Sequence, residues 1–416
     1  MLKVVVVVPT YWRWERGKLA QSDDIIYDHP IPLDQPGTLD RLLESLKGVD
    51  YPDFQVVIVT VATNPALEKA AEEKTRKIIR KFKNDFQILQ FGISDLNVIH
   101  QHLQKLRLES YIPFINLRGY SNVRNIGLIV SHLLGSDVIV GLDDDEIIVD
   151  KNYLRIATRF IGKRLNHEFI AGIAGLYLDK QRNYKLSQKE IQAKAGEKNL
   201  FQRKEVIMND AVLAVTKSRD KLVKTPFVFG GNMVIHRKMF EHVPFDPYIT
   251  RGEDIDYLIN GKILGYHFFF DKDLQIIHLP PDSSGIHSAY TYPKLKQDII
   301  RFVYESHKLA ITSMYSQHNV TLEELDPYPG YFLRKEVEEH AVEALYKMRP
   351  KEIEVEEISP EEFVANAKHR AQQLAPEYFK FQRKWIKIME VLKEDNGLVE
   401  YLSLIHISEP TRPLYI

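Results

Sequence analysis

A run of five valines near the amino terminus constrains the fold more than any other stretch. Residues 3–8 read KVVVVV, with no polar alternation, as is typical of a parallel strand buried on both faces. Residues 55–61 (QVVIVTV) form a second such run. Helical spacing of apolar residues predicts helices over 37–46, with Thr38 as the N-cap, and over 65–82. Strand and helix therefore alternate, which predicts an α/β fold with a mainly parallel sheet.

The same alternation continues to about residue 280. Further strands are expected at 86–91, 169–178, 227–236, 266–270 and 274–278, and further helices at 96–108, 121–134 (with Ser121 as the cap) and 254–264. From residue 292 onward the pattern is helical and strongly charged. We therefore expect a domain over 1–290 and a helical C-terminal extension over 291–401.

Two segments stand apart from this pattern. Residues 12–36 form a long predicted loop, which is either a lid or a solvated excursion. Residues 402–412 (LSLIHISEPTR) resemble a translated sequencing adapter. We therefore expect 402–416 to be a non-native tail without a packing role, which would leave the true C-terminus missing.

Composition excludes several function classes. The 416 residues include no cysteine, which excludes disulfides, thiolate catalysis and zinc–thiolate sites. The formal net charge of −1 gives no signal for binding nucleic acid or a membrane surface. No apolar stretch approaches the roughly 18 residues of a membrane span, and the amino terminus does not read as a signal peptide. These features predict a soluble, cytoplasmic protein.

Residues 138–150 (VIVGLDDDEIIVD) contain the most unusual local chemistry. An apolar strand ends in Asp143, Asp144, Asp145 and Glu146, whose mutual repulsion must be offset. Solvent with nearby Lys and Arg is one remedy, and a divalent cation is the other, because Mg²⁺ and Mn²⁺ accept carboxylate oxygen. If the strand continues, Asp143 and Asp145 point the same way and reach one ion.

Four more polar groups lie at predicted strand ends or helix starts, where ligands of parallel α/β sheets bind. They are Pro9-Thr10-Tyr11, Asn122-Val123-Arg124-Asn125, Gly230-Gly231-Asn232 and Glu253-Asp254. Arg124 either holds a phosphate bidentately or forms a salt bridge to a neighbouring acid. Asp254 is either a functional carboxylate or a helix N-terminal acid favoured by the helix dipole.

In this order the residues resemble family-2 and related glycosyltransferases of the GT-A fold. Those enzymes carry V-P-x-Y after the first strand, then an R-N-x-G-like helix, D-x-D, G-G-N and an E-D pair. The resemblance covers roughly residues 3–280. It implies a Rossmann-like GT-A fold and transfer of a sugar from a nucleotide-diphospho-sugar donor to a hydroxyl acceptor, with Mn²⁺ or Mg²⁺ on the donor diphosphate.

The resemblance also implies roles for particular residues. Asp254 is then the base of an inverting reaction, supported by Glu253. Asp143 and Asp145 are then metal ligands, and His278, at the end of a predicted strand, completes the metal site, with His287 as its rival. The donor-binding residues are then Pro9, Thr10, Tyr11, Arg124, Asp143, Asp144, Gly230, Gly231 and Asn232.

Several alternatives stay open. The second strand ends in TVATN and lacks the acid that often reads uracil in family 2, so the donor is a UDP- or a GDP-sugar. A related retaining synthase would glycosylate a small anionic acceptor such as glycerate or phosphoglycerate, and the basic segment 198–224 would suit that anion. Less favoured are a nucleotidyltransferase, which normally has a Gly-rich loop after the first strand, and a non-catalytic nucleotide-sugar-binding module. A homo-oligomer is also compatible with the sequence.

Overall fold

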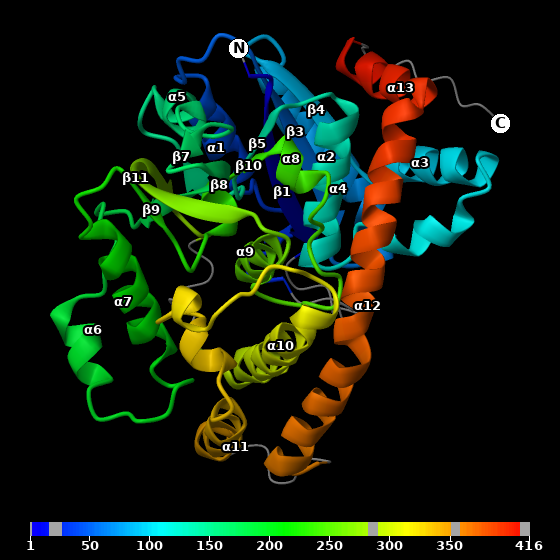
Figure 1. The fold of residues 1–416 in the computed structure, drawn as a ribbon. Helices are drawn as coiled ribbons and strands as arrows, with labels where there is room; N and C mark the ends of the chain where they lie inside the picture. Colours follow the sequence, from blue (N-terminus) through cyan, green and yellow to red (C-terminus); the bar gives the residue numbers. More distant parts are fainter. Residues whose placement is uncertain (1, 16–26, 282–289, 351–357, 408–416) are drawn as a thin grey trace.

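The computed structural model describes residues 2–15, 27–281, 290–350 and 358–407. At the centre lies one large sheet flanked by helices (Figure 1). The strands are β1 (Val4–Arg13), β2 (Ile31–Pro32), β3 (Phe54–Ala62), β4 (Gln87–Phe91), β5 (Val138–Gly141), β6 (Glu146–Ile147), β7 (Arg164–Leu165), β8 (Glu168–Leu178), β9 (Leu222–Lys224), β10 (Met233–His236) and β11 (His267–His278).

The helices cover both faces of the sheet and continue into a C-terminal extension. They are α1 (Leu39–Leu46), α2 (Glu68–Ile79), α3 (Ile93–Lys105), α4 (Tyr120–Leu133), α5 (Tyr153–Thr158), α6 (Gln188–Ala193), α7 (Lys204–Thr216), α8 (Arg237–Phe240), α9 (Glu253–Ile263), α10 (Tyr292–Ile311), α11 (Val337–Met348), α12 (Pro360–Glu394) and α13 (Asn396–Ile407). No helix within the described ranges is long and apolar enough to cross a membrane.

Strand order in the sheet is β4-β3-β1-β5-β10-β8-β11-β6, with β2 paired to β1 and β9 to β11. Pairing is parallel from β4 through β5, and again between β8 and β11, whereas β10 runs antiparallel to both of its neighbours. The predicted α/β class with a mainly parallel sheet and a helical C-terminal extension is confirmed.

The valine run is buried on both faces, as its lack of alternation predicts. Val5 and Val7 join a core with residues of α3, α4, α9, α10 and α12, while Val4, Val6 and Val8 join a second core with α1, α2 and α5. Helix α4 approaches β1 closely at a glycine. A Cβ at Gly127 would lie 2.8 Å from Cγ1 of Val7, so a larger residue there would push α4 away from the strand.

Three local predictions of backbone structure differ from the structure. Helix α4 begins at Tyr120 after Gly119, and Ser121 lies inside it, donating to the Ile249 carbonyl at 3.1 Å rather than capping. Thr38 precedes α1 but makes no side-chain cap. The two strands expected at 266–278 are one strand, β11, with an irregularity after Phe270.

Two longer segments also fold differently from the prediction. Of the strand expected at 227–236, only β10 is extended, because residues 230–232 form the 3-10 turn η4 (Gly230–Asn232). The basic segment 198–224 contains α7 and β9. In the long loop 12–36, β1 extends to Arg13 and β2 pairs with it, and residues 16–26 lie outside the described chain.

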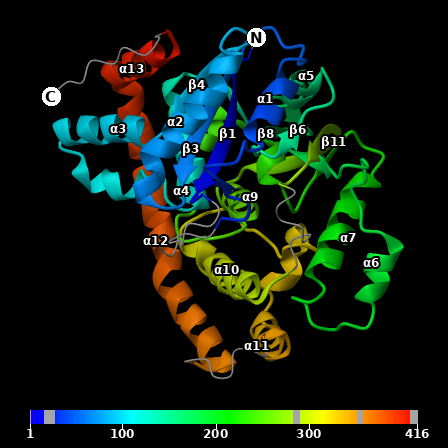
Figure 2. The same cartoon turned by 180° about the vertical axis from the view of Figure 1, so that it is seen from behind.

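The C-terminal extension packs against the sheet domain along much of its length. Helix α12 runs along one side of the molecule, opposite α6 and α7 (Figures 1 and 2). Trp385 of α12 is buried and donates to the Phe240 carbonyl at 2.9 Å. Helix α13 reaches into the adapter-like tail, and Leu402 is buried in the core. At that residue the expectation of a tail without packing is wrong.

Candidate active site

A cavity of about 320 Å³ lies beside the carboxyl ends of β1 and β5. Its walls come from β1, the turn between β5 and β6, and the starts of α4 and α9. The end of β11 and helix α10 complete it. Most of the predicted site residues line it, namely Pro9, Tyr11, Arg124, Asp143, Asp144, Asp145, Gly230, Glu253, Asp254 and His278.

The three aspartates lie in the turn between β5 and β6, so the expected strand alternation of Asp143 and Asp145 is wrong. Each aspartate has a different partner. Arg124 Nη2 donates to Asp143 Oδ1 at 2.8 Å, and the Thr10 hydroxyl donates to Asp144 Oδ2 at 2.5 Å. Asp145 Oδ2 lies 3.3 Å from Nε2 of His278. Separate partners therefore offset the repulsion that the sequence made evident.

The aspartates of the turn also differ in pKa. Burial raises the pKa of Asp144 to about 8, and neighbouring Asp145 and Asp143 raise it too. Burial also opposes ionisation of Asp145, but the hydrogen bond and charge of His278 bring its pKa below the usual value. The pKa of His278 rises because of Asp145, although burial works against that rise. At neutral pH Asp144 is therefore mostly protonated, whereas Asp145 is ionised.

Asp145 and His278 are brought together by strand pairing. His278 is opposite Glu146 in the β11–β6 ladder, directly beside the turn that carries Asp145. A carboxylate and an imidazole within 3.3 Å suit Mn²⁺, whose remaining positions diphosphate oxygens and water can occupy. Among the described residues no group of three or more His, Asp or Glu is arranged to hold an ion. Of the three predicted ligands, Asp143 is instead bonded to Arg124, so Asp145 and His278 are the two side chains that could hold a divalent cation. His287, the rival ligand, lies outside the described chain.

Arg124 connects the two acidic sides of the cavity. Its guanidinium bonds Asp143 at 2.8 Å and Glu253 at 3.3 Å, and its side chain is only 10% exposed. A Cβ at Gly230 would lie 2.6 Å from Nη2 of Arg124, so glycine there makes room for the guanidinium. The salt bridge considered for Arg124 is present, and it places a fixed positive charge on the cavity wall.

The predicted acid pair begins α9, directly after Gly252 in the left-handed region (φ +74°). Asp254 accepts from the backbone N–H of Gly230 at 3.0 Å and of Ile255 at 2.8 Å. Burial raises the pKa of both acids, that of Glu253 to about 7, while Arg124 lowers it. This is also a helix N-terminus, where the dipole favours acids. The geometry is therefore compatible with both interpretations of Asp254, as a helix N-terminal acid and as a functional carboxylate.

Three predicted donor-binding residues, Thr10, Gly231 and Asn232, are not among the residues that line the cavity. Thr10 is buried against Asp144. Asn232 is fully buried, donates to the carbonyls of Leu176 and Leu274, and accepts from the Tyr153 hydroxyl at 2.7 Å. These contacts give Thr10 and Asn232 a supporting position in this structure.

Gly231 allows close packing in the same layer. Its N–H donates to the Tyr177 hydroxyl at 2.8 Å, and a Cβ there would overlap Glu146 and Tyr177. The Tyr177 ring stacks on the His278 ring, with centroids 5.4 Å apart. Tyr177 therefore orients the imidazole beside Asp145, a role that the sequence analysis missed.

The sequence analysis also missed charged and phenolic side chains of the cavity wall, which come from α7, α10, the segment before α9 and the segment between α10 and α11. They are Lys204, Arg251, Asp298, Arg301 and Tyr328. Arg251 directly precedes the Gly252-Glu253-Asp254 motif, which was a usable signal. The others lie in the basic segment 198–224 or in the expected C-terminal extension, and nothing in their local pattern distinguishes them.

Comparisons with known proteins give little beyond this geometry. No protein-family model and no curated protein sequence matches the chain. Among 77 matching chains of solved structures is the mannosyltransferase PcManGT from Pyrobaculum calidifontis in complex with GDP-Man and Mn²⁺. It shares 12% identity, covers 97% of this chain and 87% of its own, and has a TM-score of 0.44. A mycobacterial protein shares 14% identity over 67% of each chain, with a TM-score of 0.32. At these scores the likeness carries no argument about function.

Proposed function

We propose that the protein is a metal-dependent glycosyltransferase that moves a sugar from a nucleotide-diphospho-sugar donor to a hydroxyl acceptor. The observation that carries the proposal is the division of one cavity into two acidic sides. The Asp145–His278 pair lies on the sheet side, and the Glu253–Asp254 pair lies on the α9 side. Arg124 spans the space between them.

The sheet side suits the donor diphosphate. Asp145 and His278 would hold the divalent cation, which when bound supplies positive charge that stabilises the leaving nucleoside diphosphate. Arg124 already faces this side through Asp143 and offers a planar guanidinium to phosphate oxygens. Pro9 and Tyr11, at the end of β1, line the same region.

The α9 side suits the acceptor hydroxyl. In an inverting reaction the hydroxyl oxygen attacks the anomeric carbon, the bond from that carbon to the diphosphate oxygen breaks, and Asp254 takes the hydroxyl proton. Burial raises the Asp254 pKa, which makes the carboxylate a better base near neutral pH. The two backbone N–H groups that it accepts fix its orientation. In the retaining alternative the same residues hold the reactants and the product has the other anomeric configuration.

A thermal-shift panel of UDP- and GDP-sugars, with and without Mn²⁺, tests the proposal. One donor is expected to raise the melting temperature only when metal is present, because a ligand that binds the folded state stabilises it by mass action. Added acceptors should then release nucleoside diphosphate, and NMR of the product's anomeric proton decides between inversion and retention. A panel without any metal-dependent shift would contradict the proposal, and donor binding without diphosphate release would favour the binding module.

A further inference from the structure

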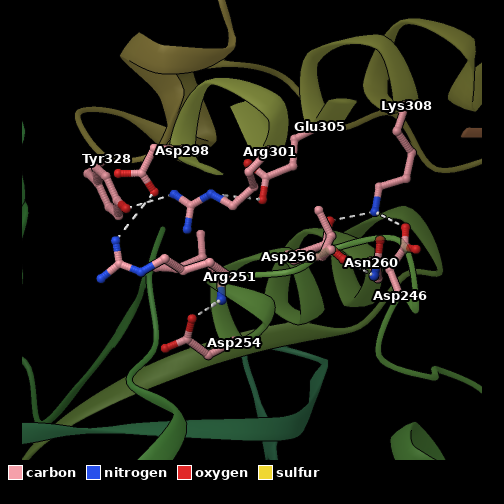
Figure 3. Close-up of polar contacts among 12 residues, drawn as sticks. Asp246, Arg251, Asp254, Asp256, Asn260, Asp298, Arg301, Glu305, Lys308 and Tyr328 are labelled. Carbon is pink, nitrogen blue, oxygen red and sulfur yellow. Dashed lines mark hydrogen bonds and ion pairs between the residues drawn. The ribbon is translucent and has the colours of Figure 1, made fainter. Parts of the chain in front are cut away.

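Three cations besides Arg124 line the cavity. Lys204 of α7, Arg251 from the segment before α9, and Arg301 of α10 all line it. The close-up shows the guanidinium groups of Arg251 and Arg301 in one region, with Tyr328 and Asp298 beside them and Asp254 nearby (Figure 3). Residues about 100 positions apart in the chain thus supply one cluster, which we call the cation pocket (Lys204, Arg251 and Arg301).

Carboxylates neutralise the cation pocket only in part. Asp298 contacts two of the cations: its Oδ2 lies 2.5 Å from Nζ of Lys204, and its Oδ1 lies 3.9 Å from Nη1 of Arg251. The second acid near Arg251 is Asp28, 3.5 Å from its Nε. Neither contact of Arg251 is a hydrogen bond, and its Nε and Nη1 are buried without any hydrogen-bond acceptor in the part of the chain that the structure describes.

Arg301 also has a guanidinium nitrogen without a hydrogen-bond partner among the described residues, and its side chain is more deeply buried than that of Arg251. Its side chain is 3% exposed, Nη2 donates to the Tyr328 hydroxyl at 2.8 Å, and Nε lies 3.6 Å from Glu305. That separation is too long for a hydrogen bond, and Arg301 Nε and both carboxyl oxygens of Glu305 are buried without a hydrogen-bond partner within the described ranges of the chain. A buried cation whose donors lack matched acceptors is unfavourable, and an incoming anion would relieve that cost.

The cation pocket lies directly beside the proposed acceptor base. A Cβ at Gly252 would overlap the Arg301 guanidinium, so this glycine lets Arg301 reach the start of α9. Arg301 and Arg124 are the two arginines whose charges lower the pKa of Asp254. Arg124 is bonded to Asp143 on the sheet side. Arg251 and Arg301 are therefore the arginines available to a second ligand beside Asp254.

We propose that the cation pocket binds an oxyanion, a phosphate monoester or a carboxylate, carried by the acceptor whose hydroxyl faces Asp254. The identification of this ligand as the acceptor rests on the proposed function. Guanidinium groups recognise both oxyanions through paired, charge-assisted hydrogen bonds, and the unused nitrogens of Arg251 provide such donors.

Titration calorimetry with inorganic phosphate and, separately, with acetate tests the site without donor or metal. Matched variants are Arg251→Gln and, as the control, Arg155→Gln, whose side chain is 52% exposed on the surface. Wild type and control should bind one anion per chain, and the better of the two anions identifies the phosphate or the carboxylate as the natural group. Arg251→Gln should weaken binding by about tenfold or more, the loss of one charged hydrogen bond. Arg251→Lys, which keeps the positive charge but lacks the paired donors of a guanidinium, should bind with intermediate affinity.

A second titration separates the acceptor from the donor. It repeats the phosphate titration with Mg²⁺ and a saturating nucleoside diphosphate, and the phosphate should still bind. Displacement of phosphate by the nucleotide would overturn the inference, because the cations would then belong to the donor diphosphate. Equal binding by Arg251→Gln and wild type, or no saturable binding, would also overturn it. If phosphate binds through Arg251 but no donor shows metal-dependent binding, the proposed function fails and the anion site stands.

Discussion

The two ends of the cavity differ in charge and in how the chain builds them. The sheet end is acidic, and its three aspartates are consecutive residues of one turn. The helix end combines the acid pair of α9 with a cluster of cations, and those cations, Lys204, Arg251 and Arg301, come from three separate segments. Backbone pairing positions the sheet end, since β11 places His278 beside β6. Side-chain packing positions the helix end.

Buried ion pairs hold the helix end together. Lys308 of α10 is fully buried and contacts Asp246 at 2.9 Å and Asp256 of α9 at 2.5 Å (Figure 3). Asp256 is two residues beyond the proposed base on α9, so the same contact joins the extension to the helix that carries the acid pair. The C-terminal extension therefore forms part of the cavity wall, although its sequence predicts a separate unit.

Asp254, at the boundary between the two ends, should give the largest effect. Asp254→Asn is expected to lower kcat about 10²–10⁴-fold, because general-base catalysis is lost. Nucleoside diphosphate release at saturating donor measures this, and Asp85→Asn, an exposed surface change, is the control. Turnover close to wild type would show that Asp254 is only a helix-terminal acid, and the cavity would lose its proposed reacting centre.

Lys308→Met should show how strongly the helix end depends on α10. Removing one partner of a buried charge cluster typically costs about 3–5 kcal/mol, and two carboxylates lose their compensation here. Urea denaturation measures the free energy of unfolding, with Lys387→Met, 65% exposed on α12, as a control that should unfold like wild type. A small effect of Lys308→Met would mean that the extension is joined by apolar packing alone.

Glu305→Gln should change the pH dependence of stability. The folded pKa is raised from 4.5 to about 8, so in this range the folded state binds a proton that the unfolded state has lost. The contribution is complete below about pH 4.5 and is lost as pH rises toward 8. The variant should therefore lose less stability than wild type between these values, by several kcal/mol, because each unit of pKa difference corresponds to about 1.4 kcal/mol. Parallel slopes for variant and wild type would mean that Glu305 is ionised in the fold.

The sequence predicted the sheet end better than the helix end for a physical reason. Apolar runs such as 3–8 report burial directly, and consecutive acids such as Asp143–Asp145 report a need for compensation. Which partner compensates which acid depends on three-dimensional placement, so the pairing of Asp145 with His278 was only a hypothesis. The expected alternation failed because the chain turns after Gly141.

The helix end gave no such local signal. Arg301 lies in the segment whose pattern is helical and strongly charged, yet it is buried against Gly252 at the start of α9 and the Tyr328 hydroxyl. Lys204 lies in a basic segment that had no clear periodicity and proved to be the start of α7. Sites assembled from single residues on distant elements leave no motif, so they appear only in the fold.

Donor titration by calorimetry with and without Mn²⁺, in wild type, Asp145→Asn and Asp254→Asn, tests the central claim most directly. The donor is the one found in the thermal-shift panel. Asp145→Asn should lose the metal-dependent part of donor affinity, whereas Asp254→Asn should bind donor as wild type does, because its carboxylate acts on the acceptor. Unchanged metal-dependent affinity in Asp145→Asn, or an equal loss in both variants, would contradict the division of the cavity into a donor side and an acceptor side.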